Sequence, residues 1–466
     1  METSTCAPAD TSSRPWARSG PPHNVSPVLA AKPRQLAAFS LRHVPSGYAP
    51  PLRPCEPCVS LAKTSLTSWG SPLRLSNSLT NTKQDFTVDG KVGLYVCGVT
   101  PYDTTHLGHA RTYIVFDVLL RHLLSAGHRV HYVQNVTDVD ESIIKRAAQL
   151  GESYDSLGDR YTAIFMEDLA NLGILPAAAY PKATGAIEEM QEMIRRLLAT
   201  DHAYRVGSDV FFRVSASQGW GRLSRLDRNA MLRLEAAQDD STSGDPRKED
   251  PLDFPLWRAA DHGPAWDSPW GPGRPGWHLE CSTLAIRHVG KQLDIHGGGE
   301  DLVFPHHECE IAQSEAVTGV RPFARFWVHV AMVRLDGRKM SKSDGNMVFA
   351  RDLLGRYSPD AIRLYLLQVH YRSPVDFDEA DLRSAASLAA ELAGAAGARV
   401  LVQDDSELVA SLRKRFVEAL DDDLDTPAAI EVLRQVVEVI GDGPTTYGTR
   451  RALRDLAAHL GLNLEG

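Results

Sequence analysis

The clearest pattern of apolar and polar positions lies in the region 91–133. Apolar side chains at 94–96 are typical of a buried strand, and this run ends at Cys97-Gly98. A polar loop rich in threonine follows, and a long apolar segment at 110–124 predicts a helix. A second strand-like run at 130–133 completes a strand–loop–helix–strand unit. Such units build open α/β sheets, and the N-terminus of their helix offers N–H groups and a positive dipole to phosphate.

The same reasoning predicts the order of the other elements. Helices are expected at 142–150, 155–172 and 186–198, and strands at 209–214, 293–296 and 326–330. Beyond residue 360 the period is helical, with helices expected at 360–368, 379–396, 406–419, 426–440 and 449–460. We therefore expect an α/β nucleotide-binding core in two halves, an inserted segment between them and a helical C-terminal domain. The expected boundaries are 1–70 for an extension, 71–174 and 271–358 for the two halves of the core, 175–270 for the insertion, and 359–466 for the helical domain.

The first 70 residues are expected to be disordered. They are rich in proline, serine, alanine and arginine, and their apolar residues show no periodicity. A transit peptide has a similar composition. We favour a misassigned start codon or a dispensable extension over a targeting peptide.

The composition limits the class of protein and its compartment. With 466 residues, 43% hydrophobic and 23% charged, the chain resembles ordinary globular proteins, and no apolar run is long enough to span a membrane. A net charge of −9 gives no overall attraction for nucleic acid, so any contact with RNA needs a local basic face. Six cysteines in so long a chain do not suggest disulfides, and we expect a monomer in the cytoplasm without a membrane partner.

Polar clusters follow two of the predicted strands. The segment 135–140, NVTDVD, comes after the strand at 130–133, and the segment 297–301, GGGED, comes after the strand at 293–296. Ligands of open parallel sheets bind at the carboxyl ends of the strands, which makes both segments candidates for substrate contact. Ordinary turns also use asparagine, threonine, aspartate and glycine.

Two short motifs connect this pattern to a known family. The segment 106–109, HLGH, resembles the HIGH signature of class I aminoacyl-tRNA synthetases, and the segment 339–343, KMSKS, resembles their second signature. The resemblance implies a Rossmann-like class I synthetase core that carries an inserted α/β connective segment and a C-terminal helical domain. It also implies that ATP binds with Mg²⁺, and that four side chains act on its phosphates: His106, His109, Lys339 and Lys342.

A metal site is the sharpest chemical hypothesis. Thiolates and imidazole are ligands that zinc prefers, and His306 and Glu310 are four residues apart, on one face of an expected helix. With Cys97 and Cys281 they form a candidate set, although scattered spacing alone equally allows buried core cysteines and a capping histidine. Cys309 points to a different face and is left out.

Longer segments resemble the cysteine-activating branch of the class I synthetases. They are GRPGWHLECS at 273–282, DIHGGGEDLVFPHHECEIAQSEA at 294–316 and RKMSKSDGN at 338–346. The resemblance implies one Zn²⁺ per chain, held by Cys97, Cys281, His306 and Glu310, which binds the thiolate of L-cysteine. A soft thiolate displaces water from zinc better than a hydroxyl does. His296 and His307 are assigned supporting positions around the metal.

The resemblance also implies an adenylate pocket on the strand ends and their neighbours. Its expected lining is Cys97, Gly98, Val99, Thr100, Thr112, Asn135, Val136, Thr137, Trp277, Gly299, Glu300, Asp301 and Val333.

Two kinds of enzyme share this catalytic core, and they differ in the acceptor of cysteine. Cysteinyl-tRNA synthetases charge tRNA(Cys). Mycothiol-pathway cysteine ligases join cysteine to the amine of 1D-myo-inosityl 2-amino-2-deoxy-α-D-glucopyranoside (glucosaminyl-inositol). Pro101 in the first motif, the segment 227–246 and a short, acidic end with aspartates at 421–423 resemble the mycothiol ligases. Glu310, His296 and the segment 370–377 resemble the synthetases, and SGDP at 243–246 departs from the ligase pattern GGDP.

We expect the mycothiol ligase, with cysteine, ATP and glucosaminyl-inositol as its partners. The first alternative is a cysteine–tRNA ligase, for which tRNA is the partner. The second alternative is a nucleotide-binding paralogue without ligase activity.

Overall fold

Four parallel strands form the central sheet, in the order β10–β9–β3–β4. The computed structural model describes residues 72–238, 241–260, 262–340, 345–398, 407–441 and 446–464, so the predicted extension and Lys342 lie outside the described residues. The strands are β3 (Lys91–Val99), β4 (Arg129–Val136), β9 (Leu293–Gly299) and β10 (Ala324–Val330). β3 and β4 come from the predicted first half and β9 and β10 from the second, so the strand order reverses between β3 and β9. Ligands of open α/β sheets bind at that switch point.

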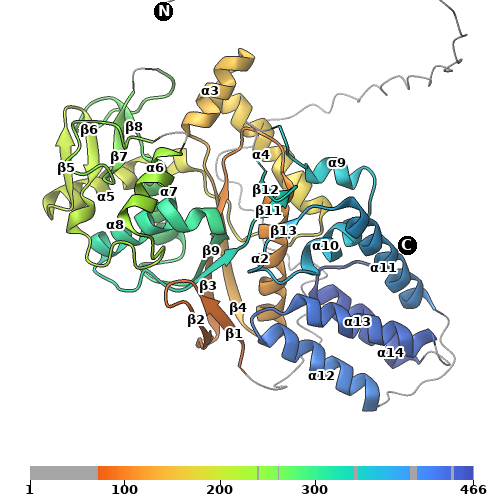
Figure 1. The fold of residues 1–466 in the computed structure, drawn as a ribbon. Helices are drawn as coiled ribbons and strands as arrows, with labels where there is room; N and C mark the ends of the chain where they lie inside the picture. The colour runs from red at the N-terminus through yellow and green to blue at the C-terminus, as the bar shows by residue number, and fades with distance from the viewer. Residues whose placement is uncertain are drawn as a thin grey trace, which may run out of the picture. The chain divides into compact units, whose positions relative to one another are not determined.

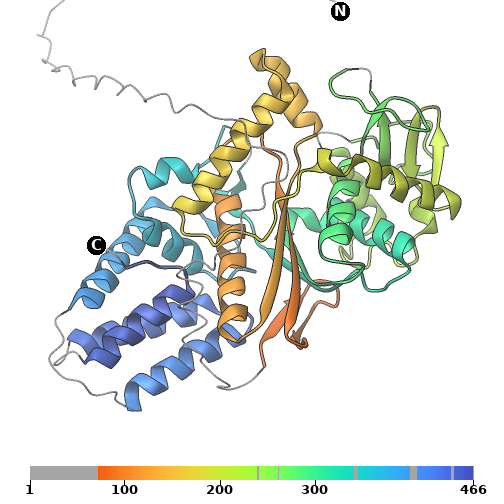
Figure 2. The same ribbon diagram turned by 180° about the vertical axis from the view of Figure 1, so that it is seen from behind.

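The two faces of the sheet belong to different cores, because successive side chains of a strand point in opposite directions. Leu94 and Val96 of β3 face one core, whereas Tyr95 and Cys97 face the other. Helix α2 (Leu107–Ser125) covers the first face, and α10 (Pro359–Leu367) and α14 (Tyr447–His459) pack against α2. The second face is covered by α7 (Trp277–His288) and α8 (Glu308–Thr318). Figures 1 and 2 show these two groups of helices on opposite sides of the sheet. Cys97 therefore lies under α7 and α8.

An antiparallel sheet forms within the predicted insertion, in the order β5–β6–β7–β8. Its strands are β5 (Ala203–Val206), β6 (Asp209–Phe212), β7 (Phe254–Ala259) and β8 (Gly273–Pro275), accompanied by η1 (Ala183–Ala186), η2 (Val214–Ala216), α5 (Ile187–Ala199) and α6 (Arg228–Ala236). Tyr95, Cys97 and Val133 of the central sheet share a core with this sheet. The expected domain boundaries stay predictions.

Smaller elements flank the central sheet. The hairpin of β1 (Arg74–Asn77) and β2 (Thr82–Asp85) lies beside β10, and α3 (Glu141–Leu150) packs on α4 (Tyr154–Asn171) after β4. After β10 the chain forms β11 (Val333–Leu335), β12 (Arg338–Lys339), α9 (Ala350–Leu354) and β13 (Val375–Asp376), with short helical turns η3 (Glu300–Leu302) and η4 (Val303–His307) after β9.

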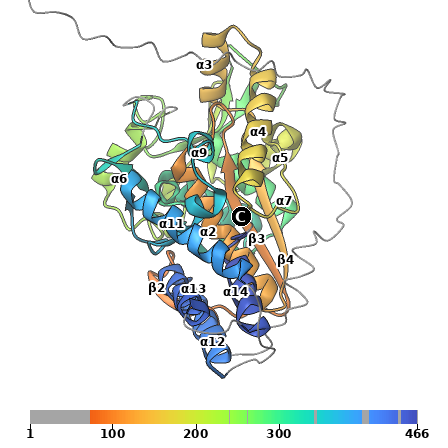
Figure 3. The ribbon, with the colours of Figure 1, turned by 90° about the vertical axis from the view of Figure 1, so that its right-hand side faces the viewer.

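The predicted C-terminal helices are present as α10, α11 (Glu379–Gly397), α12 (Glu407–Asp421), α13 (Thr426–Gly441) and α14. Figure 3 shows α12, α13 and α14 side by side, and all three pack on one another. Helix α10 begins at a capped position, because the hydroxyl of Ser358 accepts from the N–H of Ala361. Within the described ranges, no helix combines the length and apolarity needed to cross a membrane.

The acidic run 421–423 joins the C-terminal helices to the core. Asp421 lies 2.8 Å from His122 Nε2 of α2, and the amine of Lys83 donates to Asp422 at 2.7 Å. Asp423 is fully buried and accepts from the N–H of Ser76, the hydroxyl of Tyr371 and other donors. Two of the three carboxylates of this run are therefore turned into the protein.

Candidate active site

The HIGH-like segment forms the start of α2. His106 is the N-cap, and its Nδ1 accepts from the backbone N–H of His109 at 3.2 Å. The two imidazole rings stack with centroids 3.6 Å apart. A Cβ at Gly108 would lie 2.9 Å from the His106 ring, so glycine at this position lets the ring cap the helix. The first N–H groups of α2 and both imidazoles thus lie at the carboxyl edge of the sheet.

The segment after KMSKS is hydrogen-bonded to the HIGH-like segment. The N–H of Leu107 donates to the carbonyl of Val348 at 2.8 Å, and the N–H of Ala350 donates to the carbonyl of Thr105 at 2.9 Å. The structure thereby places the segment that follows KMSKS beside the HIGH-like segment. Lys339 contacts the turn after β9, since its amine lies 3.3 Å from Asp301 Oδ2.

The carboxyl ends of β3 and β4 meet in a close backbone contact. A Cβ at Gly98 would lie only 1.5 Å from the carbonyl oxygen of Asn135, so only glycine fits there. The N–H of Gly98 donates to Asn135 Oδ1 at 2.8 Å, and Asn135 Nδ2 donates to the Thr137 hydroxyl at 3.1 Å. Val99 pairs with Val136 after a shift in register that follows Val96. The predicted first-half lining of the adenylate pocket is therefore contiguous.

The other predicted lining residues have different positions. Thr112 is half-buried on α2, where its hydroxyl donates to the Gly108 carbonyl at 3.2 Å. Trp277 begins α7 and packs against His306, with ring centroids 4.2 Å apart and the rings tilted by 31°. Val333 is buried in β11. The remaining positions follow the strand ends: Thr100 is half-buried after β3, Gly299 ends β9, and Glu300 and Asp301 are exposed in η3.

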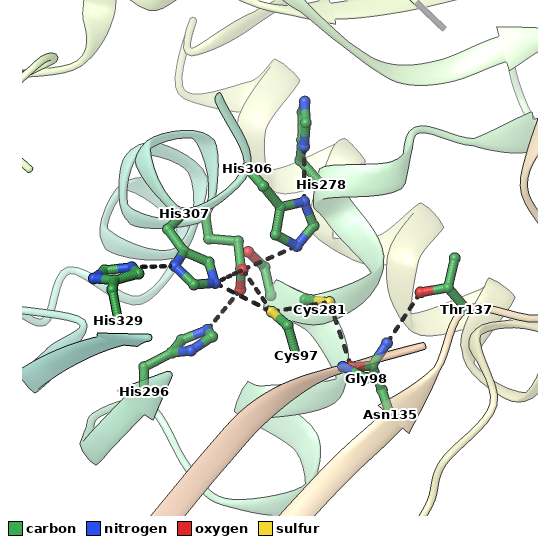
Figure 4. Close-up of polar contacts among 12 residues, drawn as sticks. Cys97, Gly98, Asn135, Thr137, His278, Cys281, His296, His306, His307 and His329 are labelled. Carbon is green, nitrogen blue, oxygen red and sulfur yellow. Dashed lines mark hydrogen bonds and ion pairs between the residues drawn. The ribbon is translucent and has the colours of Figure 1, made fainter. Parts of the chain in front are cut away.

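The four predicted metal ligands converge in a buried cluster beside these strand ends. Cys97 comes from the end of β3, Cys281 from α7, and His306 and Glu310 from the start of the α8 region. Their ligand atoms all lie within 4.8 Å of one another. The Cys97 sulfur is 3.7 Å from that of Cys281 and 3.5 Å from Glu310 Oε1, and His306 Nε2 is 3.2 Å from the same oxygen. Figure 4 shows the side chains of Cys97, Cys281 and His306 turned toward one point.

A second set of four overlaps the first. His296 and His307 join Cys97 and Glu310 within the same 4.8 Å limit. His307 Nε2 lies 3.3 Å from the Cys97 sulfur, and His296 Nε2 lies 3.0 Å from Glu310 Oε2. Supporting positions were expected for both histidines, whereas their nitrogens lie as close to Cys97 and Glu310 as candidate ligands do. Strand register explains why His296 is here, since it pairs with Tyr95 and so shares a face with Cys97.

Two further buried histidines contact His306 and His307, and neither was predicted from the sequence. The Nδ1 atoms of His278 and His306 lie 3.0 Å apart, and His307 Nδ1 lies 2.8 Å from His329 Nε2. Contacts of this kind orient metal-binding imidazoles. The three-residue spacing between His278 and Cys281 on a helix was a signal that could have been used.

The charges of the cluster can accommodate a bound cation. The hydrogen bond from Cys97, together with His306, lowers the pKa of Cys281 to about 6, whereas burial and contact with Cys281 raise the pKa of Cys97 well above its usual range. Burial alone would raise the pKa of Glu310, but His296 and His306 hold it at about 2. The two sulfurs therefore differ in how readily they lose a proton. Two sulfurs, imidazole and a carboxylate fit zinc, whose charge would allow both thiols to lose their protons.

Comparisons with known proteins show the family of this chain. A family model described as tRNA synthetases class I (C) catalytic domain matches residues 83–387. A cysteine–tRNA ligase of a Geobacter species is 44% identical over 398 residues, which cover 81% of each chain. The cysteine–tRNA ligase of Synechococcus elongatus is 47% identical over 382 residues, or 78% of each chain. The chain belongs to the class I (C) tRNA synthetase family.

Solved structures of other class I synthetases share the fold. The methionyl-tRNA synthetase of Mycobacterium tuberculosis, in complex with methionyl-adenylate, superposes with a TM-score of 0.56 at 16% identity and covers 80% of this chain and 90% of that one. The LeuRS of Agrobacterium radiobacter, in a ternary complex with tRNA, has a TM-score of 0.59 at 12% identity, with coverage of 82% and 85%. The predicted Rossmann-like core and helical C-terminal region are therefore confirmed, and the chain is a class I synthetase-type enzyme.

Proposed function

We propose that this chain activates L-cysteine with ATP and transfers it to tRNA(Cys). The observation that carries the proposal is the buried cluster of two cysteines, a histidine and a glutamate beside the strand ends that lead to the HIGH-like helix. The relatives named above are cysteine–tRNA ligases, and they match most of the chain. They favour the alternative of the sequence analysis over its first expectation and give no support to a sugar-amine acceptor.

The side-chain specificity of this proposal comes from a zinc ion, one per chain. Cys97, Cys281, His306 and Glu310 would hold it, with His296 and His307 close enough to adjust the coordination. When bound, zinc supplies a soft Lewis acid that prefers a thiolate to the hydroxyl of serine. The chain itself excludes water from the cluster, because all six side chains are buried.

Activation requires the cysteine carboxylate to attack the α-phosphorus of ATP in line. A carbon-oxygen-phosphorus link forms, the bond to pyrophosphate breaks, and cysteinyl adenylate results. The N–H groups at the start of α2 and the histidines His106 and His109 face the phosphates on one side, with Lys339 on the other. Lys342 and Mg²⁺ are assigned to the triphosphate by family resemblance. The ribose hydroxyl at the end of the tRNA then attacks the adenylate carbonyl and releases AMP.

An acceptor competition tests the proposed function. Purified chain, ATP, zinc and labelled cysteine are incubated with total tRNA in one sample and with glucosaminyl-inositol in another. We expect label on tRNA only, and none on the pseudodisaccharide. Periodate-oxidised tRNA is the control, because it lacks the terminal ribose hydroxyls and should take up no label. Label on the sugar amine instead of tRNA would contradict the proposed function and favour the mycothiol ligase. A cytoplasmic location and a monomeric state stay predictions.

Gly108→Ala should slow adenylate formation without unfolding the chain. The new methyl group would lie 2.9 Å from the His106 ring and displace it from its capping position. A catalytic group moved by about 1 Å commonly loses activity by about a hundredfold. We therefore expect cysteine-dependent ATP–pyrophosphate exchange to fall about ten- to a hundredfold with little change in Tm. Gly394→Ala on α11, where a Cβ meets nothing within 4 Å, is the matched control and should retain full exchange. Equal exchange in the two variants would show that the ring position is unimportant.

A further inference from the structure

Glu280 is a buried carboxyl group next to the metal cluster that the proposed mechanism does not use. It lies on α7 directly before Cys281 and is 1% exposed. Among the described residues, neither of its carboxylate oxygens has a hydrogen-bond partner, and no lysine or arginine forms an ion pair with it. A buried carboxyl without partners is costly and rare in native proteins. Such a group calls for a ligand that supplies the missing donors.

The surroundings of Glu280 contain polar groups that already have partners. Asp138 and Asp140 follow β4 and are close enough to act on Glu280 electrostatically. Asp138 accepts from the N–H and hydroxyl of Thr184, and Asp140 accepts from the N–H of Ser142 at 2.7 Å. These two carboxylates therefore have structural roles. Glu280 alone among the three has no hydrogen-bond partner in the described part of the chain, although the Thr137 hydroxyl lies close enough to interact with it.

Glu280 belongs to the wall of the candidate active site. The Cys281 sulfur lies 3.6 Å from Asn135 Oδ1, Asn135 bonds Thr137, and Thr137 lies beside Glu280. Figure 4 shows the first part of this row, from Cys281 through Asn135 to Thr137. Adjacent residues of an α-helix point about 100° apart, so the side chains of Cys281 and Glu280 diverge along neighbouring parts of the wall.

We propose that Glu280 binds the protonated α-amino group of the substrate. This inference rests on the proposed function, which supplies cysteine as the substrate. Only two carbon atoms separate the sulfur and nitrogen of cysteine. A ligand held by its sulfur beside Cys281 can therefore present its ammonium group to Glu280, the preceding residue of the helix. The ammonium group supplies three donors and a positive charge to a carboxylate that has neither. The site then recognises an aminothiol through two of its groups, the sulfur and the nitrogen.

Two ligands separate this role from a structural one. L-Cysteine and 3-mercaptopropionate share the thiol and the carboxylate, but only cysteine has the amino group. Their Kd values for the zinc-loaded full-length chain can be measured by calorimetry, together with Tm. In Glu280→Gln the amide keeps the size of the side chain and loses the charge. We expect the Kd of cysteine to rise by about tenfold or more, because a charge-assisted hydrogen bond is lost. The Kd of 3-mercaptopropionate should stay within about twofold.

Glu308→Gln is the matched control. Glu308 is equally buried on α8, but it accepts from the N–H groups of Gly221 and Ser224 at 3.0 and 2.8 Å. Its replacement should leave the ratio of the two Kd values unchanged. If Glu280→Gln lowers Tm, Glu280→Asp provides the second variant, since it keeps the charge and should keep a preference for cysteine over 3-mercaptopropionate.

Parallel losses for both ligands in Glu280→Gln, or an unchanged Kd for cysteine, would overturn the role of Glu280. Failure of the proposed function looks different, because the wild-type chain would then bind neither ligand, and that result would overturn both proposals.

Discussion

Cys281→Ser is expected to abolish zinc binding and to lower cysteine-dependent ATP–pyrophosphate exchange on the order of a thousandfold. Cys281 is the sulfur whose pKa is lowered, to about 6, by the hydrogen bond from Cys97 and by His306, so it is the stronger anionic ligand of the pair. A serine hydroxyl stays protonated at neutral pH and is a poor ligand for zinc. Metal content, measured by emission spectroscopy after dialysis, and exchange rates together test the expectation.

Cys309→Ser is the control for this experiment. Cys309 is also buried on α8, next to Glu310, but belongs to neither group of four ligand atoms. It should keep both zinc and exchange activity. Full zinc content and normal exchange in Cys281→Ser would contradict the assignment of the metal site.

Asp117→Asn is expected to reduce the free energy of unfolding by about 3–5 kcal/mol, the usual cost of breaking a buried ion pair. Asp117 lies fully buried on α2, where it accepts from Arg121 Nε at 2.8 Å and from Arg363 of α10 at 2.5 Å. Its other oxygen accepts from the N–H of Leu175 at 2.9 Å. The substitution leaves the Arg363 guanidinium buried without its counter-charge. Urea unfolding, followed by circular dichroism, measures the loss.

The same carboxylate predicts a dependence on pH. Burial alone would raise the pKa of Asp117, but the charges of Arg363 and Arg121 outweigh this effect and hold the pKa below its usual value. A depressed pKa stabilises the folded chain above the unfolded pKa of about 4, and this contribution is lost as the pH falls further. The wild type should therefore lose more stability below about pH 4 than Asp117→Asn does.

An exposed pair provides the comparison for Asp117. Glu379 pairs with Arg356 on the surface, with both side chains more than a third exposed. Glu379→Gln should cost less than about 1 kcal/mol. A similar small cost for Asp117→Asn would show that the buried pair does not hold α2 and α10 together.

Several elements could be predicted because one face of each meets a core. The apolar run at 94–96 became β3, and the apolar helix after it became α2. Helix α7 was missed, since His278, Glu280 and Ser282 are buried polar residues that hide the helical period. β7 was missed because Pro255 interrupts its apolar run, although the strand tolerates proline beside a register shift.

The site could be predicted only in part. Family resemblance selected Cys97, Cys281, His306 and Glu310, and the structure brings them together. Sequence spacing could not show that His307 lies 3.3 Å from the Cys97 sulfur, because the distance depends on how the chain turns before α8. It also could not show which carboxylates of the run 421–423 are turned inward.

The central claim is that this chain activates cysteine through its sulfur, and amino-acid-dependent ATP–pyrophosphate exchange tests it most directly. The zinc-loaded chain would be assayed with cysteine and with serine, which differ by one atom. The proposal predicts strong exchange with cysteine and exchange with serine lower by at least about a thousandfold, because serine offers no thiolate. Comparable exchange with both amino acids, or none with cysteine, would contradict the claim.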